Sequence, residues 1–420
     1  MALLLGLCIS TTLGFLLAHG IITAQPAALR LVVSAGQAAP GGGTFEHFSV
    51  ESQPVIAPPN ARGDVAFFAS LLRGAGTEGL FLAGARGIVK VAVEGDQAPG
   101  GGTLSGFGRH PIPSVNVERN VVFAAAVSKG RTVEGIFESS RGTLRAVAVA
   151  GEPAPGIPSG TFASLDFPAL NDRGDVVFLA TVRRGREAVE AIHLRSGGRV
   201  RKIVSQEDPA PAGGTFTAFG APALNNRGAV AFAGVVEGRG VPGGVFTVLD
   251  GRVRMLAGAG DGTPLGGIFA KFSERVTIDD TGSVAFIALL KGASVPSALF
   301  VAEENRLRKV VALGDPAPVG GVFSSFGFWP TLGPSGTVAF TASIDPGPPP
   351  TAAFVAAPVG LMKIAGIGDA LPGGAKLESF GLYPTVTMGP SGHATFASAP
   401  TAAGEGGEAI YIADPARRPP

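Results

Sequence analysis

The side chains best suited to binding chemistry lie in short segments that differ between copies of a repeated unit. Each segment follows a pair of aromatic or apolar positions, such as Phe216 and Phe219, and precedes a short strand expected near the centre of the fold. These segments hold the only Trp, one of two Tyr and charges of both signs, at Glu51, Arg109, His110, Asp166, Glu274, Arg275, Trp329 and Tyr383. Aromatic faces stack on sugars or peptides, and charged groups fix a ligand's orientation, so the pattern predicts a ligand-binding site. In the alternative interpretation, Trp329 and Tyr383 only fill the centre.

Patterns typical of catalysis or metal binding are absent from the sequence. The five histidines are His19, His47, His110, His193 and His393, and none is three or four residues from another. Metal-ligand spacing is therefore missing, and there is no Gly-x-Ser-x-Gly elbow. The sequence predicts no catalytic residue, metal or cofactor. A carbohydrate-active enzyme, a polysaccharide lyase or hydrolase, stays open as the alternative, with His110 or Tyr383 as base and Arg109 or Arg275 neutralising a uronate carboxylate.

A second set of acids recurs in the Gly-rich and Pro-rich connections between units. Six connections carry an acid three residues before Pro and the first carries Gln37; the acids are Asp96, Glu152, Asp208, Asp261, Asp315 and Asp369. A symmetric fold would arrange them as a ring that could hold a cation. The favoured alternative is that each carboxylate accepts hydrogen bonds from backbone N–H groups of its own turn, because Asp commonly does so and because the feature recurs in nearly every unit.

The element that positions all these residues is the repeat represented by Asn171 to Phe178. Its seven copies end at Phe67, Phe123, Phe178, Phe232, Phe286, Phe340 and Phe396, in steps of 54 to 56 residues. Asn or Asp opens most copies and Gly stands three residues later, as in a type I turn that leads into a buried strand. The second copy has Arg119 in place of the Gly, which predicts a distorted turn with Asn120 absorbing the change.

Each unit reads as four short strands. In the third unit these are Phe167 to Leu170 innermost, Asp175 to Val182, Ala191 to Leu194 and an outer strand with positive charge. Residues 27 to 35 resemble that outer strand but precede any unit, whereas the last unit lacks one after Glu408 to Ala413. We therefore predict an all-β fold, a seven-bladed β-propeller of four-stranded blades, closed by the N-terminal strand completing the last blade.

Residues 1 to 24 are apolar and end in Ile-Thr-Ala, which predicts a cleaved signal peptide, with a retained membrane anchor as the alternative. The propeller is then expected over residues 25 to 415. Because 33 basic residues balance 32 acidic ones, the chain has no net field to attract nucleic acid. The only cysteine, Cys8, lies in the leader, so the mature protein has no disulfide. These features predict a secreted, periplasmic or cell-envelope protein that is monomeric and meets no membrane beyond its N-terminal segment.

The repeat, from Asn60 to Phe67, Asn225 to Phe232 and Asp279 to Phe286, resembles the tandem-repeat family of bacterial exported proteins with the pattern NxxGxxAF. Members of that choice-of-anchor family are held at the cell surface by varied C-terminal anchors. The resemblance implies export and architecture but no activity, and this chain lacks a recognisable C-terminal sorting segment. The leading hypothesis is a non-catalytic propeller that binds an extracellular glycan, peptide or protein through the face bearing the channel mouth.

Overall fold

The structure is a computed structural model, and it describes residues 28–50, 53–108, 110–238, 240–304, 306–358, 360–399 and 407–414. The predicted signal peptide lies outside these residues, as do Glu51 and Arg109. Strands and turns dominate the described chain, and its one short helical element is the 3₁₀ turn η1 (Pro334–Gly336). None of the described segments forms a helix with the length and hydropathy of a membrane span.

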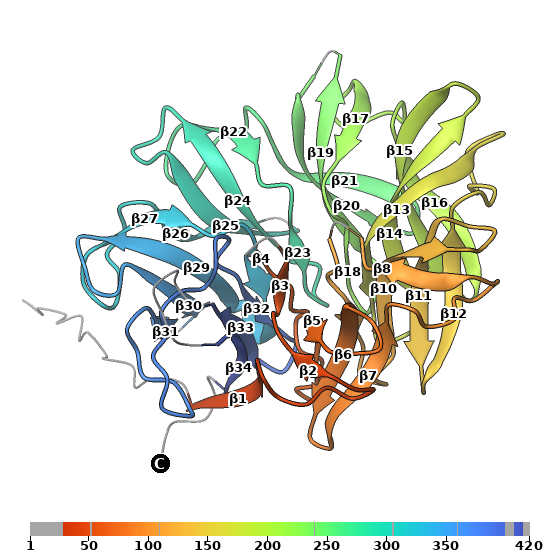
Figure 1. Cartoon of the computed structure of the whole chain (residues 1–420). Helices are drawn as coiled ribbons and strands as arrows, with labels where there is room; N and C mark the ends of the chain where they lie inside the picture. The colour runs from red at the N-terminus through yellow and green to blue at the C-terminus, as the bar shows by residue number, and fades with distance from the viewer. Residues whose placement is uncertain are drawn as a thin grey trace, which may run out of the picture.

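The strands form seven antiparallel sheets that follow one another around a ring, which confirms the predicted seven-bladed β-propeller (Figure 1). Blade 1 contains β2 (Thr44–Phe45), β5 (Val65–Leu72), β6 (Glu78–Gly84) and β7 (Gly87–Val93), with a hairpin of β3 (Ser49–Val50) and β4 (Gln53–Pro54) inserted after β2. Blade 2 contains β8 (Thr103–Gly106), β9 (Ser114–Val115), β10 (Val121–Ser128), β11 (Glu134–Ser140) and β12 (Thr143–Val149). Blade 3 contains β13 (Thr161–Leu170), β14 (Val176–Arg184), β15 (Glu187–Ser196) and β16 (Arg199–Ser205).

The next three blades repeat this plan. Blade 4 contains β17 (Thr215–Phe219), β18 (Ala223–Leu224), β19 (Val230–Glu237), β20 (Gly243–Leu249) and β21 (Arg252–Gly258). Blade 5 contains β22 (Ile268–Phe272), β23 (Thr277–Ile278), β24 (Val284–Lys291), β25 (Ser297–Glu303) and β26 (Arg306–Ala312). Blade 6 contains β27 (Val322–Phe326), β28 (Thr331–Leu332), β29 (Val338–Asp345), β30 (Thr351–Ala357) and β31 (Gly360–Gly366).

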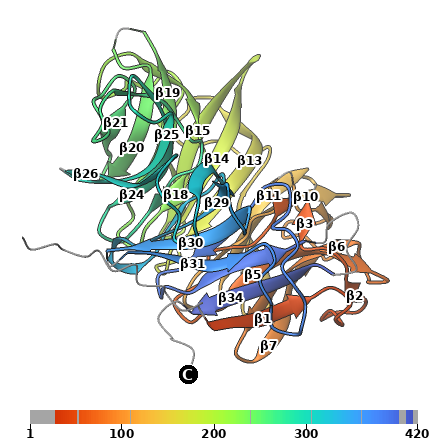
Figure 2. The same cartoon turned by 90° about the vertical axis from the view of Figure 1, so that its left-hand side faces the viewer.

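Blade 7 closes the ring by combining the two ends of the chain. It contains β32 (Val386–Met388), β33 (Ala394–Ser398), β34 (Ala409–Asp414) and, from the N-terminus, β1 (Ala28–Ser34). β1 pairs antiparallel with β34, from Ala28 opposite Asp414 to Ser34 opposite Ala409, and the two lie side by side in Figures 1 and 2. The predicted closure by the N-terminal strand is confirmed.

The innermost strand is longer than predicted. In blade 3 it begins at Thr161 and not at Phe167, so the aromatic position Phe162 already belongs to it. Its pairing with β14 is interrupted between Asp166 and Ala169. In blades 4 to 6 the same interruption divides the inner strand into two pieces that pair with opposite ends of the second strand. The variable segments are therefore bulges halfway along the inner strands, because the chain leaves the sheet there and returns to it.

The repeated Phe forms the core, as the pattern indicates. Phe67, Phe123, Phe178, Phe232, Phe286 and Phe396 are fully buried and Phe340 is nearly so. Each lies opposite a second ring on the third strand, for example Phe232 opposite Phe246 with ring centroids 5.5 Å apart. In blade 3 that second ring is His193, opposite Phe178. Aromatic pairs of this kind bury large apolar areas, so each blade is stabilised by its own ring cluster.

The expectation of a distorted turn in the second copy is wrong. Arg119 itself adopts the left-handed conformation with φ of 66°, close to the 76° to 93° of the equivalent Gly63 and Gly282. The turn keeps its hydrogen bond from the Arg119 N–H to the Asn116 carbonyl, at 3.0 Å. The Arg119 guanidinium donates to the buried Asp64 carboxylate of blade 1 at 2.6 Å. This charge-assisted contact offsets the backbone strain of a non-Gly residue at positive φ.

Candidate functional site

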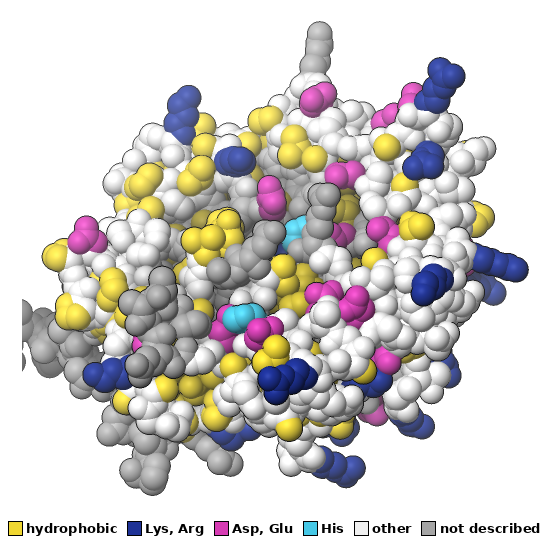
Figure 3. Space-filling model, in the orientation of Figure 1, with side chains coloured by type: hydrophobic (Ala, Val, Ile, Leu, Met, Phe, Trp, Pro, Cys, Tyr) yellow, Lys and Arg dark blue, Asp and Glu magenta, His cyan; other side chains and the backbone are white. Residues whose placement is uncertain are grey.

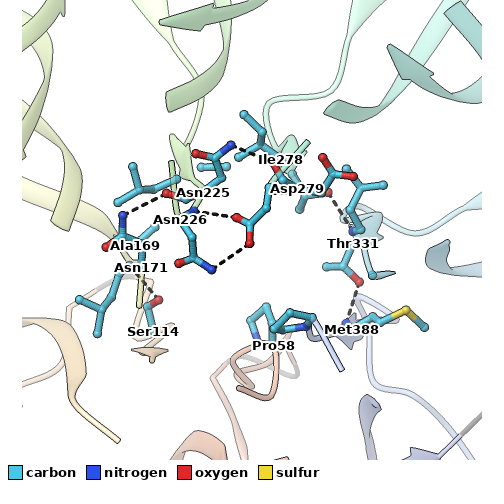
Figure 4. Close-up of a pocket in the computed structure, with 18 of the residues that line it drawn as sticks. Pro58, Ser114, Ala169, Asn171, Asn225, Asn226, Ile278, Asp279, Thr331 and Met388 are labelled. Carbon is cyan, nitrogen blue, oxygen red and sulfur yellow. Dashed lines mark hydrogen bonds between the residues drawn. The ribbon is translucent and has the colours of Figure 1, made fainter. Parts of the chain in front are cut away.

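A cavity of about 460 Å³ occupies the centre of the ring and is lined by inner strands of all seven blades. Its wall is largely apolar, because several blades present Pro and small side chains there, such as Pro58, Pro168 and Ala169. Figure 4 shows the lining residues converging from every side, and Figure 3 shows acidic and histidine side chains around a hollow with an apolar floor. A concave apolar cavity with a few polar groups is the usual form of a ligand site.

The Asn of the repeated turn fixes the shape of this cavity. In the Asn171 turn, Oδ1 accepts the backbone N–H groups of Arg173 and Asp175 at 3.1 and 2.9 Å. The side-chain amide then donates to the carbonyl of the corresponding residue in the next blade (Figure 4). Four such bonds run from Asn60 to Asn116 at 2.9 Å, Asn116 to Asn171 at 3.3 Å, Asn171 to Asn225 at 3.0 Å and Asn225 to Asp279 at 2.8 Å.

Threonine completes the ring of inter-blade bonds where the turn offers no amide. The fifth turn begins with Asp279, whose carboxylate does not donate, and the sixth and seventh turns begin with Gly333 and Gly389, which have no side chain. Inner-strand hydroxyls replace it, from Thr277 to the Pro330 carbonyl at 3.2 Å, Thr331 to Val386 at 3.4 Å and Thr387 to Ala57 at 3.2 Å. The seven bonds join every neighbouring pair of blades. We call this ring of four Asn and three Thr the polar belt.

Four of the predicted site residues are linked by contacts around the ring of Phe167, which His110 and Arg275 touch directly. The His110 imidazole stacks on Phe167 with centroids 4.4 Å apart, and its Nδ1 lies 2.7 Å from Oδ2 of Asp166. The Arg275 guanidinium carbon lies 5.1 Å from the Phe167 centroid and 4.9 Å from that of Trp329. His110, Asp166, Arg275 and Trp329, which come from blades 2, 3, 5 and 6, thus form one cluster with Phe167.

Phe167 is held in an unfavourable backbone conformation. Its φ is 50°, in the left-handed region that bulky residues avoid. The bulge that places it there is stabilised by Asp166, whose Oδ1 accepts the Phe167 N–H at 2.8 Å. Strained residues persist where the surroundings determine them, and they concentrate at binding and catalytic sites. The strain turns the Phe167 ring into the cavity that it lines.

Arg275 lines the same cavity and is packed closely by its neighbours. Burial lowers the pKa of the Arg275 guanidinium to about 10, although the negative charges of Asp166 and Glu274 oppose the change. The backbone of Arg275 is bridged to Ala221 of blade 4. Gly220 permits this approach, since a Cβ there would lie 2.0 Å from the Glu274 carbonyl oxygen. The small residues of blade 4 therefore leave room for Arg275 to reach Phe167.

Of the remaining predicted site residues that the structure describes, Tyr383 and Glu274 are not part of this cluster. Tyr383 instead packs edge-on against Phe328 with centroids 5.1 Å apart, and Phe328 is 63% exposed. Glu274 is exposed beside Arg275. Glu51 and Arg109 belong to the positions that the structure does not describe. Sequence reasoning missed Phe167 as the centre of the cluster and assigned it to the inner strand, because its positive φ has no signature in the residue type.

The repeated acids serve the connections between blades. Asp208 accepts the Ser205 N–H at 2.8 Å and the Lys202 ammonium at 2.8 Å, and Asp96, Asp315 and Asp369 make the same two contacts with their own outer strands. Asp261 accepts the Gly258 N–H at 2.7 Å. Each of these five carboxylates therefore accepts a backbone N–H group, as predicted. The donor is the residue three positions earlier, at the end of the preceding outer strand. Among the described residues, no group of three or more His, Cys, Asp or Glu could hold a metal ion.

Comparisons with known proteins give a family and a fold. A model of a family of unknown function, DUF7453, matches residues 3–292 and 262–418. No curated protein sequence matches the chain.

Among solved structures, an oligogalacturonate lyase in complex with manganese is similar at a TM-score of 0.50 with 12% identity, covering 93% of this chain and 98% of that one. A puromycin-hydrolysing peptidase of Mycobacterium tuberculosis is similar at 0.45 with 14% identity, covering 86% and 52%. An ulvan lyase gives 0.39 with 10% identity, covering 92% and 95%. Likeness at such low identity concerns the fold alone.

Proposed function

We propose that this chain, which belongs to the DUF7453 family of unknown function, is an exported, non-catalytic propeller. It binds a glycan, peptide or protein through its channel mouth. The observation that carries this proposal is the cluster in which His110 and Arg275 pack on the strained Phe167, Asp166 contacts His110 and Trp329 packs on Arg275. Aromatic faces and charges gathered at one concave site supply both stacking and orientation. The polar belt supports it, since a rigid ring keeps these groups in place without the ligand.

Location is part of the same proposal. Residues 1 to 24 act as a cleaved signal peptide, and residues 25 to 415 form the propeller in the periplasm, cell envelope or medium. Fractionation of the host cell and mass measurement of the mature chain test this. A chain that starts at Gln25 outside the cytoplasm supports export, and a full-length cytoplasmic chain contradicts it.

The binding test is a glycan and peptide array probed with purified residues 25–420 and with two variants. Trp329→Ala should weaken ligand binding by roughly tenfold or more, because it removes the ring that stacks on the ligand and that packs against Arg275. Leu249→Ala is the control, because Leu249 is 44% exposed at the end of β20 and takes no part in the cluster. An array without hits contradicts a glycan or peptide ligand, and hits that Trp329→Ala leaves at full strength contradict binding at the channel mouth.

One observation favours an enzyme as the second candidate. His110 is oriented by Asp166 at 2.7 Å and shares the Phe167 ring with Arg275. In a uronate polymer, His110 as base would remove the C5 proton next to the carboxylate held by Arg275. The C4–O glycosidic bond would break as the C4–C5 double bond forms, and the departing oxygen would take a proton from water, giving an unsaturated sugar. Tyr383 is a poorer base candidate because it packs on Phe328. Release of unsaturated product by wild type, lost in His110→Asn and in Arg275→Ala, would establish this activity.

A further inference from the structure

The most unusual charge in the cavity is the guanidinium of Arg275. It lies against two aromatic rings, Phe167 and Trp329, at 5.1 and 4.9 Å. Within the described part of the chain, no hydrogen bond or ion pair engages its side-chain nitrogens. The other arginines that face a neighbouring blade differ in this respect, since Arg119 donates to Asp64 at 2.6 Å and Arg195 to Glu138 at 2.7 Å. Arg275 is thus a packed cation with aromatic neighbours but without a bonded anion.

The nearby carboxylates are occupied or turned to solvent. Asp166 uses Oδ2 for His110 and Oδ1 for the Phe167 N–H, so both oxygens are already engaged. Glu274 is exposed and makes no ion pair with Arg275. A guanidinium that is partly removed from water and has no bonded anion gains charge-assisted hydrogen bonds when an anion binds it. The site is therefore suited to a negatively charged ligand group that enters the cavity from solvent.

The surface next to Arg275 indicates what else the ligand carries. Trp329 is only partly buried, Phe328 is 63% exposed and Leu382 is 67% exposed, and Tyr383 packs edge-on against Phe328. Exposed aromatic surface beside a cation is suited to a pyranose ring, whose C–H face stacks while its polar groups bond to the surroundings. A planar guanidinium matches a carboxylate with two parallel hydrogen bonds.

We propose that the ligand is a saccharide chain containing uronic acid, and that Arg275 binds the uronate carboxylate while the aromatic surface of Trp329, Phe328 and Tyr383 holds neighbouring sugar rings. This inference rests on the proposed function and specifies its ligand class. Arg275 acts here as the residue that determines specificity for charge. Trp329 holds the guanidinium in place and contributes stacking.

Calorimetric titration of purified residues 25–420 with trigalacturonate and with neutral galactotriose tests the proposal. Wild type should bind the uronate trimer at least tenfold more tightly, and rising salt should weaken this binding. Arg275→Gln should lose roughly 10- to 100-fold in affinity for the uronate trimer, so that its preference for this trimer over galactotriose disappears. Arg275→Lys, which keeps the charge but not the planar fork, should fall between the two. The matched control is Arg254→Gln, since Arg254 lies on the outer strand β21 and forms an exposed ion pair with Glu304 of blade 5.

The outcomes separate this inference from the proposed function. Equal affinity of wild type for the two trimers overturns the uronate assignment and leaves a glycan-binding propeller in place. Binding of an acidic peptide, but of no saccharide, that is lost in Arg275→Gln also overturns it. Absence of any glycan or peptide ligand refutes the proposed function in its glycan-binding and peptide-binding forms. Because the comparison of two ligands uses wild type, the result does not depend on whether the variants fold.

Discussion

Replacing His193 with Phe should remove a pH-dependent loss of stability. His193 occupies the position in blade 3 that is Phe246 in blade 4, and the two environments are almost identical. The His193 ring lies 5.7 Å from Phe178 at 16° and 5.0 Å from Phe162 at 80°, and the Phe246 ring lies 5.5 Å from Phe232 at 19° and 5.0 Å from Phe216 at 79°. His193 has no exposed surface, and its Nδ1 has no hydrogen-bond partner. A charged imidazole is therefore poorly accommodated.

The magnitude follows from the pKa. Burial, aided by the positive charge of Lys202, lowers the pKa of His193 from 6.5 to about 4, against the opposing interactions with the backbone of Pro155 and Ala191. As pH falls below 6.5, His193 takes a proton in the unfolded chain but not in the folded one. The free energy of unfolding therefore decreases through this window and levels off below about pH 4. At about 1.4 kcal/mol for each tenfold change in proton affinity, the loss is about 3 kcal/mol.

The assay is urea unfolding of wild type and His193→Phe at several pH values between about 7 and 4. The difference in the free energy of unfolding between the two proteins should change by about 3 kcal/mol across this range, in favour of His193→Phe at low pH. Phe246→His is the matched control, because it places a second imidazole in the equivalent setting and should add a similar pH dependence. A difference between wild type and His193→Phe that stays constant from neutral to acidic pH would refute the reasoning.

Three further substitutions test the core, the polar belt and the closure. Phe232→Ala removes a fully buried ring and should cost about 3 to 5 kcal/mol in chemical unfolding; a cost near zero would contradict its place in the core. Asn171→Ala leaves the Asn225 carbonyl and two turn N–H groups without their bonds and should cost about 2 to 3 kcal/mol, whereas unchanged melting would show that the belt is dispensable. Glu408→Ala removes the carboxylate that accepts the Phe48 N–H and the Ser49 hydroxyl across the closure, at 2.5 and 3.0 Å. Limited proteolysis should then cut near the N-terminal strand faster than in wild type, and equal rates would argue against this role.

Much of the fold could be predicted because it depends on features that repeat along the chain. Phe178 and its counterparts recur every 54 to 56 residues, and such a period requires units that stack on one another. The pattern shows one strand too many at the N-terminus, Ala28–Ser34, and one too few after Ala409–Asp414. The closure of the ring by the N-terminal strand could therefore be predicted. These inferences use only hydrophobic pattern and turn chemistry, which act locally and are the same in every copy.

The candidate site could be located but not assembled from the sequence. The segments that differ between copies do contain His110, Asp166, Arg275 and Trp329. Their convergence depends on the positive φ of Phe167 and on the missing Cβ of Gly220, which decide how far each bulge reaches into the channel. Tyr383 stands in an equivalent segment but packs on Phe328 instead. Distances between residues of different blades are set by packing and have no trace in sequence spacing.

The sequence by itself determined the number of blades, the core residues and the strand that closes the ring, because periodic burial is a property of each unit. The tertiary structure alone decided that the turn asparagines bond to the next blade and that Arg275 lies between two aromatic rings without a bonded anion among the described residues. Both facts arise where separate units meet. The contacts of a side chain at such a junction depend on how neighbouring blades pack in the ring, and the sequence of one repeat does not contain this information.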